Sequence, residues 1–361
     1  MQKTLYLHIG TEKTGSTALQ AVSGLNREAL IRHGIFYPKT PGDRNHIRLS
    51  IFAADPQNVV DLRRLARMYP NAVYENFRAQ FAESLQSEIL EDHCARVYLS
   101  NEHLSSRLKS VEEVRRLAAI IQPLADSVKV VVYLRRQPEL FLSTYSTSIK
   151  AGATKALQPP KKDQHPRYNY EKLLSLWAEV FGDRNVIVRI YDRNTLVGHD
   201  VVKDFFSILD YEPGPDIEIP STLNGRLDHD ALCFLLEFNK HIPLFLEEGV
   251  NPDRGDIVQA LEARSKGSAL PVPASVLRRL SKIYQESNAR AAHRFLGRSD
   301  GQLFADVEYE DSQAGEPLTA ERAVEISAEL WRAKQRELEE AKREITRLKY
   351  KLESARGNRP P

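Results

Sequence analysis

Two short segments of the sequence combine residue types that bind phosphate-like groups. The first is the run His8-Ile9-Gly10-Thr11-Glu12-Lys13-Thr14-Gly15-Ser16-Thr17, which follows an expected strand and opens an expected helix. Backbone N–H groups at such a helix start have no partner within the helix, and the helix dipole favours an anion there. Thr14, Ser16 and Thr17 add hydroxyl donors, and Lys13 adds a positive charge. This segment therefore predicts an anion-binding loop.

The loop nearly matches the nucleoside-triphosphate pattern G-x-x-x-x-G-K-[ST], with Gly10, Gly15 and Thr17 in the expected places. Its lysine does not fit, because Ser16 occupies that position and the loop's only lysine is Lys13. In an NTPase this lysine must reach the β- and γ-phosphates. The displacement argues against ordinary ATP hydrolysis. An ordinary glycine-containing turn is the plainer alternative.

The second segment begins with Arg135-Arg136, directly after an expected buried strand at 128–134. An arginine at the carboxyl end of a strand faces the crevice where α/β proteins bind ligands. Ser143 lies eight residues after Arg135, so its hydroxyl and the guanidinium can bind one phosphate together. The neighbouring Arg136 has the same eight-residue spacing to Thr144, so Arg136 and Thr144 form the alternative pair. Cations are unfavourable at a helix start unless an anion binds, which favours a binding role over a solvated helix start.

Together the two segments resemble the 5'-phosphosulfate and 3'-phosphate motifs of sulfotransferases that use 3'-phosphoadenosine-5'-phosphosulfate (PAPS). The first motif often reads Lys-Thr-Gly-Ser-Thr, as residues 13–17 do here, and the second matches Arg135 and Ser143. Further stretches from about residue 4 to 305 resemble a bacterial, carbohydrate-sulfotransferase-like family. The resemblance implies PAPS as co-substrate, adenosine 3',5'-bisphosphate as product, and an acceptor hydroxyl on a saccharide or glycolipid. The residues themselves are equally compatible with a hydroxyl on a small metabolite.

Sulfuryl transfer also needs a base that takes the acceptor proton. The resemblance implies a Glu or a His, and three candidates remain open. Glu102 is favoured because it directly follows the expected strand 96–100, ahead of His46 in the loop after the first helix and of the neighbouring His103. Lys13 would meet the charge that develops on the leaving phosphate. We expect no metal site.

Two other classes of protein remain as alternatives. One is a P-loop kinase or NTPase-like enzyme, and the other is a non-catalytic nucleotide-binding scaffold with a coiled-coil tail. Nucleic-acid binding is not expected, because the formal net charge is only +2 and no interleaved basic–aromatic motif is present.

The elements that must position these residues follow from apolar periodicity. Strands are expected at 4–9, 35–38, 96–100, 128–134 and 186–191. Helices are expected at 16–32, 75–92, from about 138, and at 169–182, 200–209, 228–240, 255–264 and 274–295. Loops are expected at 39–58 and 152–168. The alternation predicts an α/β, P-loop-type three-layer fold with a central, mostly parallel sheet.

We expect one sulfotransferase domain at 1–315, with an α/β core at 1–212 and a helical cap at 213–315. The segment 316–361 is expected to be a C-terminal coiled-coil helix with a frayed end. In it, Leu338, Ala341, Ile345, Leu348 and Leu352 alternate steps of three and four, which is a heptad seam. Glu337 with Lys342 and Glu344 with Lys349 stand at g and e positions that suit a parallel homodimer, and a lone helix packed on its own domain is the plainer alternative.

The acceptor is expected to contact the variable loops, where Lys161, Lys162, Tyr168 and Tyr170 are candidates, although a solvated loop is the favoured interpretation there. Cys94 and Cys233 have no disulfide or zinc spacing, so reduced thiols are expected. With neither a signal-peptide pattern nor a membrane-spanning stretch in view, the expected location is the cytoplasm.

Overall fold

The computed structural model of the chain describes residues 2–68, 71–163, 165–220, 227–247, 249–265, 272–309 and 317–357. Its centre is a five-stranded parallel sheet with the order β2-β3-β1-β4-β5. The strands are β1 (Thr4–His8), β2 (Ile35–Phe36), β3 (Arg96–Ser100), β4 (Ser127–Leu134) and β5 (Val186–Ile190). The expected α/β class with a parallel sheet is confirmed. The chain runs from β1 outward to β2 on one side of the sheet, and later from β3 across β1 to β4 on the other side. The topological switch point, where such sheets bind ligands, therefore lies between β3 and β1.

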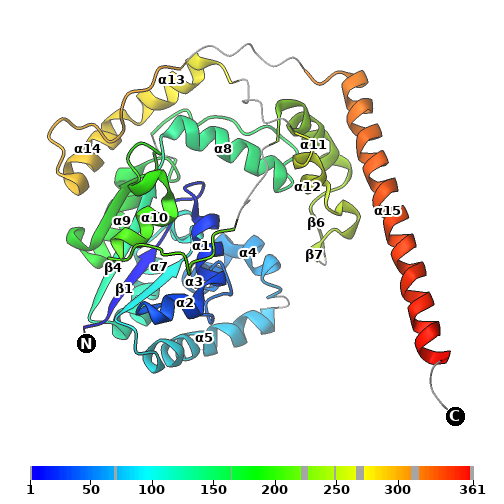
Figure 1. Cartoon of the computed structure of the whole chain (residues 1–361). Helices are drawn as coiled ribbons and strands as arrows, with labels where there is room; N and C mark the ends of the chain where they lie inside the picture. The colour runs from blue at the N-terminus through cyan, green and yellow to red at the C-terminus, as the bar shows by residue number, and fades with distance from the viewer. Residues whose placement is uncertain are drawn as a thin grey trace. The chain divides into compact units, whose positions relative to one another are not determined.

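Helices cover both faces of this sheet and make three layers (Figure 1). Alternate residues of β4 point to opposite faces: Val130 and Val132 join one core, and Val131 and Tyr133 join the other. Burial on both faces explains why this strand is apolar nearly throughout. The first core includes α3 (Ile47–Ala53), α5 (Asn71–Glu91), α7 (Val111–Ile121), α9 (Tyr170–Phe181) and α14 (Gln285–Leu296). The second includes α1 (Ser16–Leu25), α2 (Arg27–Arg32) and α10 (Val201–Ile208).

The chain divides into two compact units. The unit with the sheet comprises Met1–Tyr145, Leu157–Asn224 and Val272–Ser312, and the other comprises Ser146–Ala156, Gly225–Pro271 and Gln313–Pro361. The second unit contains α11 (His229–His241), a hairpin of β6 (Phe245–Leu246) and β7 (Gly249–Val250), α12 (Ile257–Glu262) and α15 (Ala320–Gly357). The expected cap at 213–315 is thus distributed over both units. Within the described ranges, no helix is long and apolar enough to cross a membrane.

Three expectations about local structure were wrong. The helix expected at 16–32 is broken at Asn26, whose side chain donates to the carbonyls of Val22 and Glu218. The helix expected at 274–295 is likewise two helices, α13 (Ala274–Ile283) and α14, separated at Tyr284.

The third is the loop expected at 39–58, which contains α3 and the 3-10 helix η1 (Pro56–Val59). The Pro- and Asn-rich composition of this segment favours a loop, but Leu49, Ile51 and Phe52 are buried in the core. Tertiary burial of this kind overrides local propensity.

Candidate active site

The loop between β1 and α1 depends on two glycines with positive φ. Gly15 has φ 82°, and a Cβ there would lie 2.6 Å from Cγ1 of Val201. Gly10 has φ 98°, and a Cβ there would lie 2.9 Å from Cα of Glu102. Glycine adopts such conformations without steric cost, and its missing Cβ leaves room for these close neighbours. The loop is therefore packed directly against the ends of other elements.

Hydrogen bonds inside the loop fix its shape. The Thr14 hydroxyl is fully buried and donates to the Thr11 carbonyl at 2.6 Å, and the Thr11 hydroxyl donates to the Tyr133 carbonyl at 3.0 Å. Thr14 thus holds the loop together, a role that the sequence did not indicate.

The uncapped donors of the loop lie around the start of α1. This helix begins at Ser16, and no side chain caps it. The Ser16 hydroxyl is 4% exposed and has no hydrogen-bond partner among the described residues. Thr17 and Lys13 are exposed, and Lys13 has φ 68°, a left-handed conformation that a lysine rarely adopts. An uncapped helix start with a buried orphan hydroxyl has the donors that an anion requires.

The structure brings Arg135 into direct contact with this loop. Its Nη1 donates to the Lys13 carbonyl at 3.0 Å, and its Nε donates to the Glu139 carboxylate at 3.2 Å. Its guanidinium lies 5.5 Å from the centre of the Tyr191 ring, and the Tyr170 hydroxyl donates to its carbonyl. The two segments predicted to bind anions therefore meet at the carboxyl ends of β1 and β4.

The neighbouring Arg136 is occupied by protein groups. It donates to Asp192 at 2.7 Å, to Glu139 at 3.2 Å and to the Ala305 carbonyl at 3.2 Å. Burial opposes its charge, but the bonds to Asp192 and Glu139 outweigh burial and raise the pKa of Arg136. Ser143 lies farther along α8 (Gln137–Lys150) and is half-buried.

Glu102 follows β3 directly and lies against Gly10. Its carboxylate accepts hydrogen bonds from Gln20 at 2.7 Å and from Asn45 at 3.1 Å. A carboxylate has about four lone-pair positions, so two amide donors leave capacity to accept a proton. No group of three His, Cys, Asp or Glu side chains that could hold a metal ion occurs among the described residues.

His46 is enclosed in the core, with no exposed surface. Its Nδ1 accepts from the Ser100 backbone N–H at 3.1 Å, so its Nε2 carries the proton and donates to the Pro38 carbonyl at 3.0 Å. Its ring stacks on Tyr37 at 4.1 Å. Burial lowers the pKa of His46 to about 3, so the ring is neutral at working pH. Both nitrogens are in use, which disfavours His46 as the base.

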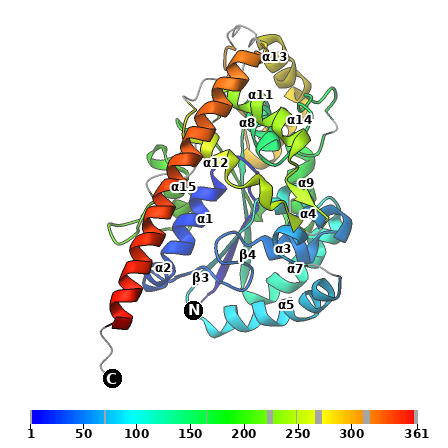
Figure 2. The same ribbon diagram turned by 90° about the vertical axis from the view of Figure 1, so that its right-hand side faces the viewer.

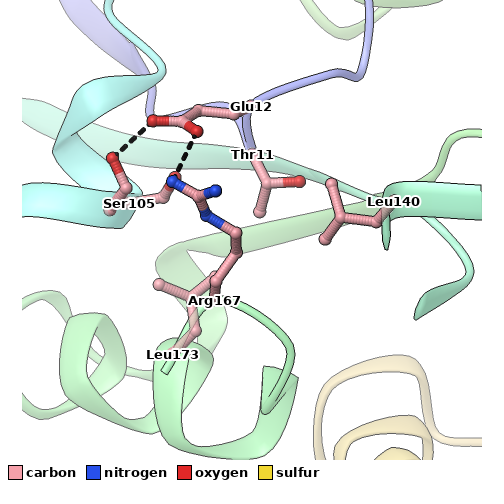
Figure 3. A pocket seen from close by; sticks show the side chains of 7 residues that line it. Thr11, Glu12, Ser105, Leu140, Arg167 and Leu173 are labelled. Carbon is pink, nitrogen blue, oxygen red and sulfur yellow. Dashed lines mark hydrogen bonds and ion pairs between the residues drawn. The ribbon is translucent and has the colours of Figure 1, made fainter. Parts of the chain in front are cut away.

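His103 belongs to a network centred on Glu12, which the sequence did not reveal. Glu12 interacts with His103 Nδ1 at 3.2 Å, with the Ser106 hydroxyl at 2.7 Å and with Arg167 at 2.9 Å. Figure 3 shows the Glu12 carboxylate turned toward the Arg167 guanidinium beside a small pocket that Thr11 and Leu140 also line.

The charges of this network balance one another. Burial alone would raise the pKa of Glu12, but the hydrogen bond from His103 and the charge of Arg167 hold it at about 2. Burial alone would lower the pKa of His103, but Glu12 raises it. The raised pKa favours the protonated form of His103, which has no lone pair with which to act as a base. The partners of Glu12 lie about 90 and 155 residues away in sequence, so no local signal could have indicated the network.

The two tyrosines considered for an acceptor cleft have other roles. Tyr168 is 3% exposed, and Tyr170 is fully buried in the core of the sheet. Lys161 and Lys162 are exposed in the segment before them.

Comparisons with known proteins give distant similarities. No family model matches the chain. An uncharacterized protein of Archaeoglobus fulgidus is 26% identical over 204 residues, and the match spans 55% of each chain, about half the relative's length. Among solved structures, a sulfotransferase from Alicyclobacillus acidocaldarius has a TM-score of 0.36 at 16% identity, covering 61% of this chain and 88% of the other. The sulfotransferase domain of the Synechococcus PCC 7002 olefin synthase has a TM-score of 0.34 at 13% identity, covering 78% of this chain and 94% of that domain. At these scores the function must be argued from the site itself.

Proposed function

We propose that the chain is a sulfotransferase that moves a sulfuryl group from PAPS to an acceptor hydroxyl. The observation that carries the proposal is the 3.0 Å hydrogen bond from Arg135 to the Lys13 carbonyl, because it joins two anion-binding elements in one site. PAPS has a 5'-phosphosulfate and a 3'-phosphate, and this pair of elements offers one binding group for each end.

The 5'-phosphosulfate is assigned to the start of α1. The helix itself gives the N–H groups of Ser16 and Thr17 no partner, and the buried Ser16 hydroxyl is orphaned among the described residues. A phosphosulfate would satisfy these donors. Lys13 keeps a left-handed conformation that costs a non-glycine residue roughly 1–2 kcal/mol. Retaining a lysine there at that cost supports a role for its charge.

The 3'-phosphate is assigned to Arg135 and Ser143. Arg136 is already neutralised by Asp192 and Glu139, so recruiting it would leave those carboxylates without their partner. Arg135 shares Glu139 with Arg136 and is 23% exposed, so its guanidinium is open to a ligand. Its planar fork can hold a phosphate with two parallel hydrogen bonds.

Glu102 is the proposed base. It sits at the end of β3, next to the strand that carries the phosphate loop, and it is the one of the three candidates with unused acceptor capacity. The acceptor oxygen attacks the sulfur while the bond from sulfur to the 5'-phosphate oxygen breaks. Glu102 takes the hydroxyl proton, and adenosine 3',5'-bisphosphate leaves with the electron pair. Lys13 stabilises the negative charge that develops on this leaving group.

The acceptor class proposed is a saccharide or glycolipid hydroxyl, and the proposed location is the cytoplasm. Both rest on the sequence resemblance and the sequence pattern. The competing kinase hypothesis differs from the proposal in the nucleotide that the protein binds, whereas the scaffold hypothesis differs in that no sulfuryl transfer follows nucleotide binding.

Calorimetric binding of adenosine 3',5'-bisphosphate, AMP and ATP–Mg²⁺ tests the proposal directly. We expect micromolar binding of the bisphosphate alone, lost in Arg135→Ala and unchanged in the control Arg115→Ala, which alters a surface arginine of α7. Arg135→Lys keeps the charge without the planar fork, so we expect intermediate affinity. If the bisphosphate binds as expected, the next assay measures transfer of labelled sulfate from PAPS to saccharide acceptors. Preference for ATP–Mg²⁺, or no nucleotide binding at all, would overturn the proposal.

A further inference from the structure

Helix α15 is a single helix of 38 residues (Figure 2), and it contacts α11 of its own unit. Ile326 is 2% exposed, Arg322 pairs with Asp230 at 2.9 Å, and Lys334 pairs with Asp256 at 2.6 Å. Arg264 and Glu329 form a further ion pair. These contacts hold the first half of the helix, whereas residues 336–352 are exposed throughout.

A different face of α15 is apolar and uncovered. Its large apolar residues recur every seven positions and are 47–68% exposed: Val324, Trp331, Leu338, Ile345 and Leu352. A seven-residue spacing drifts by only about 20° per repeat, so these side chains form one stripe along the helix. Ile326 follows Val324 by two residues and points to the opposite side of the helix. The stripe is therefore separate from the packed face.

The positions between these residues complete a coiled-coil seam in the second half of the helix. Ala341 and Leu348 lie three residues after Leu338 and Ile345, as the d positions of heptads whose a positions are those two residues. In the first half the corresponding positions are polar. We therefore place the tight part of the seam at 338–352.

We propose that this seam binds a second copy of the chain in a parallel coiled coil. The charges beside the seam argue for this occupant. Glu337 and Glu344 stand at g positions, and Lys342 and Lys349 stand at the e positions that face them across a parallel pair. In an antiparallel pair g faces g and e faces e, so glutamate would face glutamate and lysine would face lysine.

Formation of the dimer requires only a few weak ion pairs within α15 to break. In the single chain Glu337 bonds to Lys334 at 2.8 Å and Glu344 bonds to Arg347 at 2.7 Å. Such exposed pairs within a helix contribute only tenths of a kcal/mol, so they can yield to pairs across the dimer.

Sedimentation equilibrium of the full chain tests the pairing. We expect a dimer that the double variant Leu338→Asp/Ile345→Asp weakens at least about 100-fold, because it places charges in an apolar seam. The matched control Tyr350→Asp changes an exposed residue off the seam and should leave the dimer intact. A wild-type monomer at about 100 μM, or a dimer that survives the double variant, would overturn the proposal.

A cysteine at position 348 tests the orientation. In a parallel pair the two copies of Leu348→Cys face each other and should form a disulfide on mild oxidation, whereas Tyr350→Cys should not. If dimers form but Leu348→Cys fails to cross-link, the parallel arrangement is wrong. Nucleotide binding does not enter either readout, so the result is independent of the proposed function.

Discussion

Replacing Glu12 by glutamine should destabilise the unit that contains the sheet by about 3 kcal/mol. The pKa of Glu12 is held at about 2 against an ordinary value of 4.5, and each pKa unit is worth about 1.36 kcal/mol. The Glu12 side chain is only 19% exposed, so solvent screens the ion pair with Arg167 weakly. Glutamine keeps the size of the side chain but removes the charge that His103 and Arg167 share.

The sign of the pH dependence follows from the lowered pKa. Glu12 stabilises the folded state fully above pH 4.5, and this stabilisation is lost as the pH falls toward 2. From pH 6 to pH 3.5 the contribution of Glu12 to the unfolding free energy of the wild type should fall by about 1.4 kcal/mol. The Glu12→Gln variant lacks this contribution at both pH values. The gap in unfolding free energy between the two proteins should therefore narrow by that amount. The pKa of His103 is raised, so at pH 6 its positive charge also stabilises the Glu12 carboxylate.

Urea unfolding followed by tryptophan fluorescence can measure this gap. The sequence has two tryptophans: Trp177 is buried beside the sheet, whereas Trp331 is 67% exposed, so the change in emission reports mainly the sheet unit. The control Glu179→Gln removes an exposed carboxylate that pairs with Arg115 and should cost less than about 1 kcal/mol. A gap below about 1 kcal/mol at pH 6, or one that stays constant down to pH 3.5, would refute the reasoning.

Two further predictions concern the base. Glu102→Gln should lower kcat for sulfate transfer at least about 100-fold and leave the affinity for adenosine 3',5'-bisphosphate unchanged in calorimetry, because the variant loses only the proton acceptor. Unchanged turnover would exclude Glu102. His46→Gln should lower the unfolding free energy by about 2 kcal/mol, because it disturbs two buried hydrogen bonds, yet leave the pH profile of kcat in place. A displaced profile would mean that His46 titrates during turnover.

The sheet could be predicted from the sequence because its strands have a strong local signature. The run VKVVVYL of β4 is apolar on both faces, and the strand lies within one residue of its expected start. Helix ends were predicted less well. The break at Asn26 depends on Glu218, which is distant in sequence. In contrast, the start of α7 has a local signal, the capping box formed by Ser110 and Glu113.

The candidate site shows the same division between local and long-range information. The positions of loop 10–17 and of Arg135 at strand ends follow from residue type and spacing, whereas their binding of phosphate groups stays a prediction. The roles of His46 and Glu12 depend on what surrounds them. The sequence predicts a loop around His46, but the Ser100 N–H and the Pro38 carbonyl bind its two ring nitrogens in the core. No periodicity or spacing records such contacts.

The hydrogen bond from Arg135 to the loop is accepted by a main-chain carbonyl, so evolution can change the side chain at position 13 without removing this bond. Any residue at position 13 presents that carbonyl, so the loop keeps its anchor whichever side chain stands there. A substitution at position 13 therefore changes the side chain that is proposed to meet the leaving group and keeps the hydrogen bond that anchors the loop. A saturation library at this position should yield mostly folded proteins, with asparagine and glycine best tolerated by the left-handed backbone.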